Sequence, residues 1–201
     1  MLSVDITAQR VWPRRTATLV PRTSESAFMA NSSLIAFEEA FVVMFDRETS
    51  QEQVIRRLAA TLEAEGCVKP TFADAVLERE KAFPTGLPTE VGIALPHTDV
   101  EHVMRNALSI GVLRQPIAFG QMGGGGKEVE AHLVCLLAIS EKEAVVNSLS
   151  RLVSALQDGE LLNAMRNATS RSQVVDLLVR ALPDLVAHHE RPNRTSAARL
   201  V

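Results

Sequence analysis

Short apolar runs alternate with amphipathic stretches between about residue 40 and residue 182. Each run has the length of a buried strand, and each is bounded by turn-forming or charged residues. The last run is uninterrupted by charge, which is typical of a central strand covered on both faces. The predicted strands are Ala40–Phe45, Gly92–Leu95, Ala107–Leu113 and Leu133–Ile139.

The stretches between the first strands show the period of a helix. Thr49 stands three residues before Glu52, which is the signature of a capping box, and an apolar stripe follows as far as Gly66. Thr71, or a residue beside it, is expected to open a second helix that ends before Pro84.

The carboxyl-terminal part of the chain predicts three more helices. Ser140 and Glu143 repeat the capping signature, so a helix is expected from there to about Gln157. Shorter helices are expected near Glu160–Arg166 and Ser170–Leu182. Strands separated by helices predict an α/β fold, with a mixed, largely parallel sheet sandwiched by helices on both faces. Ligands of such folds bind beyond the carboxyl ends of the strands.

The two ends of the chain differ from this pattern. Residues 1–28 contain scattered arginines, Thr, Ser and two prolines without a sustained period, so we expect a disordered leader and regard Met29 as an alternative start. Residues 183–201 are expected to form a loose tail. The folded domain is therefore predicted to span residues 29–182.

Composition excludes several classes of function. The net charge of −3, with one Trp and no Tyr, gives neither the cationic field nor the stacking surface of a nucleic-acid-binding protein. No apolar run approaches the roughly 20 residues that span a bilayer, so we expect no membrane insertion. Cys67 and Cys135 are isolated and are interpreted as reduced thiols of a cytoplasmic protein.

The candidate functional residues lie between Glu78 and His102. The predicted strand Gly92–Leu95 runs into Pro96 and His97, and proline makes the chain leave the sheet in a defined direction. An imidazole placed at that edge is suited to carry a group near neutral pH. One ring nitrogen acts as the nucleophile, while a hydrogen bond to the other sets the tautomer.

These residues carry a resemblance to a known family. Arg79-Glu80, the turn Pro84-Thr85-Gly86-Leu87 and the strand that ends at Pro96-His97 resemble the fructose/mannitol-type (type 2) enzyme IIA proteins of the bacterial sugar phosphotransferase system. The resemblance covers about Ala36 to Leu182. The sequence motif PTG…IALPH, with a second histidine at His102, resembles the galactitol-specific branch more than the mannitol branch. Mannitol-type members carry a second active-site histidine where this chain has Glu143-Ala144-Val145.

The resemblance implies a cytoplasmic phosphocarrier. His97 would accept a phosphoryl group from phospho-HPr and pass it to an enzyme IIB, which serves the membrane enzyme IIC, for galactitol or a related polyol. Neither a metal nor another cofactor is implied. His97 must be neutral when it attacks, so its other nitrogen is expected to bind a carbonyl or carboxylate.

Arg79 and Thr85 each have both a purely structural and a functional interpretation. Arg79 is either a solvated charge or a guanidinium placed over the phosphoryl group, a task for which lysine lacks the planar fork of donors. The Thr85 hydroxyl either donates to a phosphate oxygen or stabilises the turn at Gly86.

His102 leaves three interpretations open. It packs at a helix start, assists beside the phosphorylated imidazole, or joins His97 and Asp99 in a metal site of a hydrolase. The metal interpretation is the weakest, because zinc needs three or four ligands at fixed geometry. A different class of function is a regulatory module of the nitrogen type, which acts by phosphorylation-dependent partner binding.

The glycine run Gly123–Gly126 before Lys127 fails as a phosphate-binding loop. The motif requires a glycine where Gln121 stands and a hydroxyl where Glu128 stands, and a strand follows instead of a helix. A flexible connecting loop is expected.

Overall fold

The computed structural model describes residues 34–47 and 50–188, without the side chains of residues 142–145 and 187–188. These residues belong to the unit Ser33–Val201. The predicted leader at residues 1–28 and the chain beyond His188 lie outside the described residues. So does Thr49.

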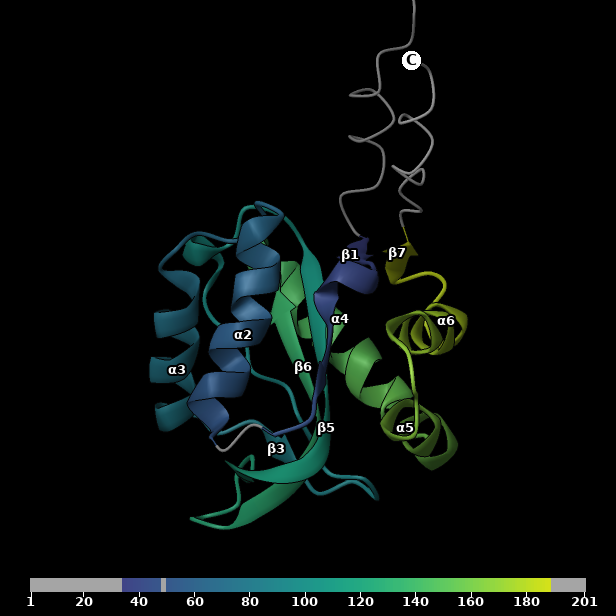
Figure 1. Cartoon of the computed structure of the whole chain (residues 1–201). Coiled ribbons are helices and arrows are strands. Elements are labelled where there is room, and N and C mark those ends of the chain that lie inside the picture. The colour runs from purple at the N-terminus through teal and green to yellow at the C-terminus, as the bar shows by residue number, and fades with distance from the viewer. Residues whose placement is uncertain (1–33, 48–49, 189–201) are drawn as a thin grey trace, which may run out of the picture. The chain divides into compact units, whose positions relative to one another are not determined.

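One seven-stranded sheet organises the described chain (Figure 1). Its order is β3-β4-β6-β5-β1-β7, and β2 also pairs with β5. Four of the pairings are parallel, whereas β5 with β6 and β3 with β4 are antiparallel. The strands are β1 (Ile35–Phe37), β2 (Val42–Phe45), β3 (Gly86–Leu87), β4 (Ile93–Ala94), β5 (Ala107–Gly120), β6 (Glu128–Ala138) and β7 (Val186–His188).

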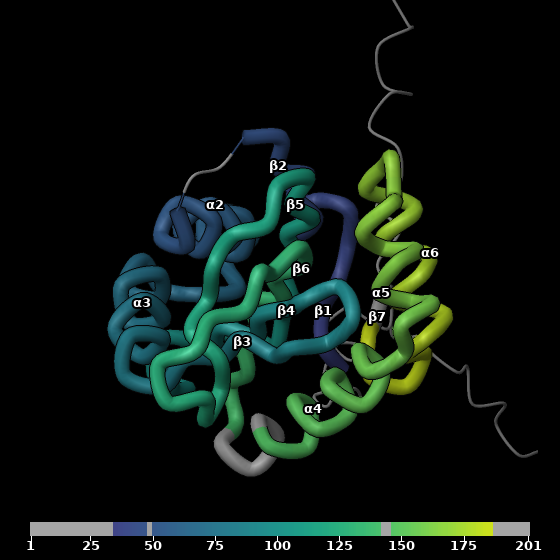
Figure 2. The backbone as a smooth tube through the Cα atoms, turned by 90° about the horizontal axis from the view of Figure 1, so that it is seen from below, coloured from purple at the N-terminus to yellow at the C-terminus, as the bar shows by residue number. Residues whose placement is uncertain are grey.

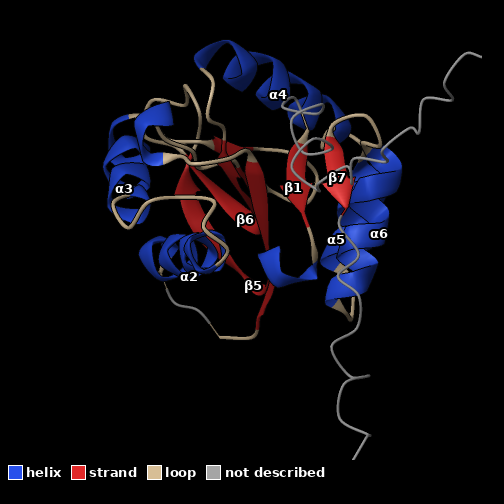
Figure 3. Cartoon of the chain, turned by 90° about the horizontal axis from the view of Figure 1, so that it is seen from above, coloured by secondary structure: helices blue, strands red, loops and turns tan. Residues whose placement is uncertain are grey.

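Helices cover both faces of the sheet, which confirms the predicted fold class. Helices α2 (Gln51–Ala64) and α3 (Phe72–Ala82) lie on one face. Helices α5 (Gly159–Arg166) and α6 (Arg171–Ala181) lie on the other, as Figure 3 shows. Helix α4 (Lys142–Ala155) leads from the end of β6 toward α5. The single-turn 3-10 helices η2 (Glu39–Phe41) and η3 (Val100–His102) complete the elements.

The long hairpin of β5 and β6 forms the centre of the sheet (Figure 2). Its ladder is interrupted between Val112 and Ile117, where Pro116 lacks the N–H that a ladder bond needs. The glycine run closes the hairpin, and Gly123, Gly125 and Gly126 have positive φ. Strand β6 follows directly, so this loop lacks the strand-to-helix turn of a nucleotide site.

Two helix starts differ from the sequence prediction. Ser50 caps α2, because its side chain accepts a hydrogen bond from the Gln53 N–H. Glu141 precedes α4 without a side-chain cap. Ser140, the predicted cap, instead donates through both its N–H and its hydroxyl to Asn106 Oδ1. The capping prediction for Ser140 was wrong, because Glu141 holds the cap position of α4 and Ser140 is anchored to Asn106, 34 residues away in the sequence.

Three strand predictions also change. Residues 40–41 of the predicted first strand belong to η2, so β2 begins at Val42. Strand β1 was not predicted, and it pairs with β5 and β7. The predicted tail begins with a turn and β7, so the chain from Pro183 to His188 is part of the sheet's edge. Strands of three residues carry too little pattern to be recognised without their partners.

Candidate functional site

His97 lies at the edge of the sheet, just past β4, where it forms an isolated bridge with Leu137 of β6. Gly92 permits this arrangement. It has φ +70°, and a Cβ there would lie 2.1 Å from the Glu130 carbonyl oxygen. Glycine therefore lets β4 approach β6 closely enough to pair with it. The predicted strand that delivers a histidine to the sheet edge is confirmed.

Both ring nitrogens of His97 have partners. Nδ1–H donates to the Leu95 carbonyl at 2.9 Å, which leaves the Nε2 lone pair available. Nε2 lies 3.4 Å from Nη2 of Arg79, a distance at the long end for a hydrogen bond. The carbonyl partner expected for the second nitrogen is therefore present, and it leaves Nε2 as the ring nitrogen with a lone pair.

The surroundings of His97 keep the imidazole neutral. Burial lowers its pKa, and the Arg79 charge lowers it further. The bond to the Leu95 carbonyl and the Asp99 carboxylate act in the opposite direction, but the net pKa shift is downward. The ring is thus in the form that has a nucleophilic nitrogen.

Arg79 lies in the last turn of α3, and its guanidinium contacts His97, Asp99 and the Phe83 ring. Its Nη1 lies 3.8 Å from Asp99 Oδ1, and its guanidinium carbon lies 5.6 Å from the centre of the Phe83 ring. Its Nε is buried and has no protein hydrogen-bond partner in the described structure. The Arg79 guanidinium therefore lies beside His97 and near the Phe83 ring, and its side chain is 34% exposed.

Thr85 is buried next to the site and uses its donors elsewhere. Its hydroxyl donates to Glu80 Oε2 at 2.7 Å, and its N–H donates to Glu80 Oε1 at 2.9 Å. The single hydroxyl proton is therefore committed to Glu80. This geometry agrees with a role in the turn at Gly86 and not with donation to a phosphate oxygen.

His102 makes its contacts at the start of α3. Its Nδ1 lies 2.9 Å from the Thr71 hydroxyl, and its Nε2 lies 3.3 Å from Glu101 Oε1. Thr71 is the residue that precedes α3. The structure thus supports the helix-start interpretation. No group of three or more His, Cys, Asp or Glu residues in the described ranges is arranged to hold a metal ion.

The remaining predicted residues lie away from Nε2 of His97. His132 lies inside β6, with its Nδ1 3.3 Å from the Leu113 carbonyl. Cys67 and Cys135 are free and buried, and complete burial raises the pKa of Cys135 to about 12. Cys67 accepts a hydrogen bond from Arg105 Nε at 3.1 Å. Both thiols are inert under ordinary conditions.

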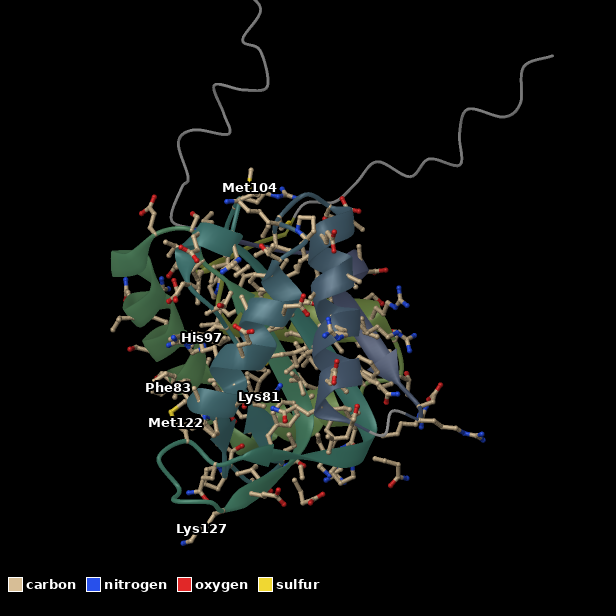
Figure 4. All side chains as sticks on the ribbon, turned by 90° about the vertical axis from the view of Figure 1, so that its left-hand side faces the viewer. Lys81, Phe83, His97, Met104, Met122 and Lys127 are labelled. Carbon is tan, nitrogen blue, oxygen red and sulfur yellow. The ribbon has the colours of Figure 1, made fainter. Side chains whose placement is uncertain are left out.

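An open groove of about 610 Å³ lies beside Arg79, between the end of α3 and the β5–β6 loop. Phe83 and Met122 line it, and they are 66% and 46% exposed. Figure 4 shows both on the same side of the molecule as His97, whereas Met104 lies at the opposite end. An exposed apolar rim beside a reactive group fits contact with a protein partner.

Glu80 and Phe83 are neighbours of the site to which the sequence assigned no role. Glu80 had a signal, because it occupies the same helical stripe as the buried Phe72 and Val76. A carboxylate on an apolar stripe indicates a buried polar contact. Phe83 had no such signal, since single exposed aromatic residues are common.

None of the helices in the described chain is both long and apolar enough to cross a bilayer.

The chain aligns with only part of the length of each of two curated relatives. The chain is 31% identical over 132 residues to the mannitol-specific EIICBA component of the phosphotransferase system from Escherichia coli K12, which covers 66% of the chain and 20% of that protein. It is 25% identical over 116 residues to the galactitol-specific EIIA component from Escherichia coli O157:H7, covering 57% of the chain and 77% of that protein. The chain thus spans about a fifth of the mannitol relative.

Solved structures agree with this relationship. The crystal structure of IIA mannitol from Escherichia coli has a TM-score of 0.58 and 27% identity, covering 69% of this chain and 96% of that one. The sequence profile of the family described as "Phosphoenolpyruvate-dependent sugar phosphotransferase system, EIIA 2" matches residues 36–181. This match takes in strands β2–β6, helices α2–α6, Arg79 and His97, and the chain belongs to that family.

Proposed function

We propose that this protein is a phosphocarrier that accepts a phosphoryl group on Nε2 of His97 and passes it to an enzyme IIB. The observation that carries the proposal is the pair of contacts on the imidazole. Leu95 holds Nδ1–H, while Nε2 faces Arg79 and keeps its lone pair. An imidazole held in this way is a nucleophile with a cation at the position where negative charge arrives.

The transfer needs little chemistry from the protein. The Nε2 lone pair forms a new N–P bond while the N–P bond of phosphohistidine on HPr breaks, and the HPr imidazole leaves with the electron pair. Charge spreads over the phosphoryl oxygens, so positioning and electrostatics dominate. The Nη groups of Arg79 and its unpartnered Nε–H supply donors for those oxygens.

The onward transfer from His97 to enzyme IIB uses the same arrangement of His97 and Arg79. Support for this partner comes from a related structure, described as a complex of enzyme IIA(Mtl) and phosphorylated enzyme IIB(Mtl) from Escherichia coli, with 26% identity and a TM-score of 0.59. Phe83, whose ring centre lies 5.6 Å from the Arg79 guanidinium carbon, lines the open groove together with Met122. Two partners can therefore approach one imidazole in turn, and through enzyme IIB the group reaches a sugar at the membrane enzyme IIC.

Galactitol or a related polyol is the proposed sugar. The sequence motif PTG…IALPH and the absence of histidine in residues 143–145 support this sugar class, as does the galactitol-specific relative. The identity to the mannitol-specific relative is higher, at 31% against 25%. The enzyme IIB that accepts the group from this chain decides between them.

The test is phosphorylation of the full chain by labelled phosphoenolpyruvate in the presence of enzyme I and HPr. We expect labelling only when both proteins are present, and an adduct that is labile in acid and stable in base, as a phosphoramidate is. His97→Gln should abolish labelling, while His132→Gln, in a histidine away from the site, should leave it intact. Labelling of His97→Gln to the extent of the wild type would overturn the proposal.

A regulatory function is the second candidate. The chain is 27% identical over 104 residues to the transcriptional regulator ManR of Bacillus subtilis. A regulatory module would accept phosphate on His97 and change its affinity for a partner, without passing the group on. Chase of the labelled chain with an enzyme IIB separates the two: loss of label to enzyme IIB supports transport, and retention by the chain supports regulation.

A further inference from the structure

Glu80 is a buried acidic residue that the transfer chemistry does not use. It is 4% exposed and lies on the face of α3 that contains Phe72 and Val76. Within the described part of the chain, Glu80 has no salt-bridge partner, and both carboxylate oxygens are bound by Thr85 alone. Burying a carboxylate without a cation is unfavourable, and here burial raises the pKa of Glu80.

The hydrogen bonds of Thr85 continue toward the site. The Thr85 carbonyl accepts the Leu95 N–H at 3.4 Å, and the Leu95 carbonyl accepts Nδ1–H of His97 at 2.9 Å. Thr85 precedes β3 and Leu95 follows β4, and these two strands pair through Gly86 and Ala94. These hydrogen bonds therefore link the carboxylate to the imidazole through the backbones of Thr85 and Leu95.

The same carboxylate also fixes the other half of the site. Glu80 follows Arg79 in the last turn of α3, whereas His97 follows the β3–β4 hairpin. The two hydrogen bonds from Thr85 join the end of this helix to the start of the hairpin. They therefore hold the element that carries Arg79 against the element that carries His97, whose side chains meet at 3.4 Å.

We infer that Glu80 is a positioning residue that acts through Thr85 and Leu95 to keep Nδ1 of His97 protonated and Nε2 beside Arg79. The inference rests on the proposed function for its effect on phosphoryl transfer. Its effect on the tautomer of His97 does not depend on that function. A small misplacement of reacting groups is enough to slow a transfer reaction strongly.

Thr85→Val tests the inference with little change of shape. It removes the hydroxyl donor to Glu80 and keeps a branched side chain of similar volume. Thr85→Ser restores the hydroxyl. Glu80→Gln is the second variant, because its amide offers one acceptor to the two donors of Thr85. Val76→Ala is the control, since it weakens the packing of the same face of α3 and leaves the hydrogen bonds in place.

Two readouts separate positioning from general destabilisation. Nitrogen-15 NMR of the histidine side chains reports the tautomer of His97 in the unphosphorylated chain. Single-turnover labelling by phospho-HPr reports the transfer rate. We expect Thr85→Val and Glu80→Gln to populate the other tautomer and to slow labelling about tenfold. Thr85→Ser and Val76→Ala should keep the wild-type tautomer and stay within about twofold of its rate.

The outcomes are distinct. Wild-type tautomer and rate in folded Thr85→Val and Glu80→Gln would overturn the inference. So would an equal loss in Val76→Ala, which would make the effect one of stability. If the wild-type chain accepts no phosphate, the proposed function fails, and the tautomer measurement still decides whether Glu80 positions His97.

Discussion

Arg79 and His97 are 18 residues apart in the sequence, and the fold brings Nη2 of one to 3.4 Å from Nε2 of the other. The arginine comes from the last turn of a helix, and the histidine follows a strand of two residues. The opposite ring nitrogen is bound to a backbone carbonyl, so the atom that faces the guanidinium is the one with a lone pair.

Arg79→Lys should fold normally and slow phosphoryl transfer. Lysine has no planar fork of donors, and losing a charge-assisted contact corresponds to about 1.5–3 kcal/mol, or roughly tenfold to a hundredfold in rate. The measurement is single-turnover labelling. Arg114→Lys is the control, because Arg114 is exposed and pairs with Asp46. Equal rates in both variants would reduce Arg79 to a surface charge.

The titration of His97 should affect stability. Burial, with help from the Arg79 charge, lowers the pKa of His97 below its ordinary value of about 6.5. Between the lowered value and about 6.5, the unfolded chain binds more protons at this residue than the folded chain does, so stability rises with pH in that window. Denaturation at a series of pH values should show a smaller slope in His97→Gln than in the wild type. An NMR titration midpoint at or above the ordinary value would contradict this prediction.

His102→Ala should affect stability more than transfer. The contact between His102 and Thr71 at the start of α3 is lost, which corresponds to about 0.5–1.5 kcal/mol. Phosphorylation of His97 should persist in this variant and vanish in His97→Ala. Chelator should change neither result. Stoichiometric zinc in the purified protein, with equal loss of activity in both variants, would instead support the metal-site interpretation.

Met122→Gln should weaken partner binding without slowing the chemical step. Met122 lines the groove beside Phe83, and losing its apolar contact with a partner corresponds to about 1 kcal/mol, or roughly fivefold in KM for phospho-HPr. Met104→Gln is the matched control, because Met104 is 61% exposed and lies at the other end of the molecule (Figure 4). Equal effects of the two substitutions would argue against docking at the groove.

A chain that begins at Met29 should keep the melting temperature and the transfer activity of the full chain. Residues 1–28 lack the pattern of a core-forming element. Thermal unfolding and labelling by phospho-HPr measure the two properties. A large loss of stability would show that the leader packs on the domain.

The sequence by itself determined the features that depend on neighbouring residues. An apolar stripe predicted helix α2, helix start and stop signals predicted α3, α5 and α6, and the apolar run before Pro96 predicted the strand that leads to His97. Their signals are local, because periodicity and proline geometry act over a few residues. Arg79 was indicated as a candidate by the resemblance to the enzyme IIA family, which gave no distance to His97.

Only the tertiary structure decided which groups meet. Ser140 donates a hydrogen bond to Asn106 and does not cap the start of α4. The Thr85 hydroxyl donates to Glu80. Strands β1 and β7 form because each gains a partner from a distant part of the chain. A hydrogen bond goes to whichever partner the packed chain places within about 3 Å, and the local sequence does not specify that partner.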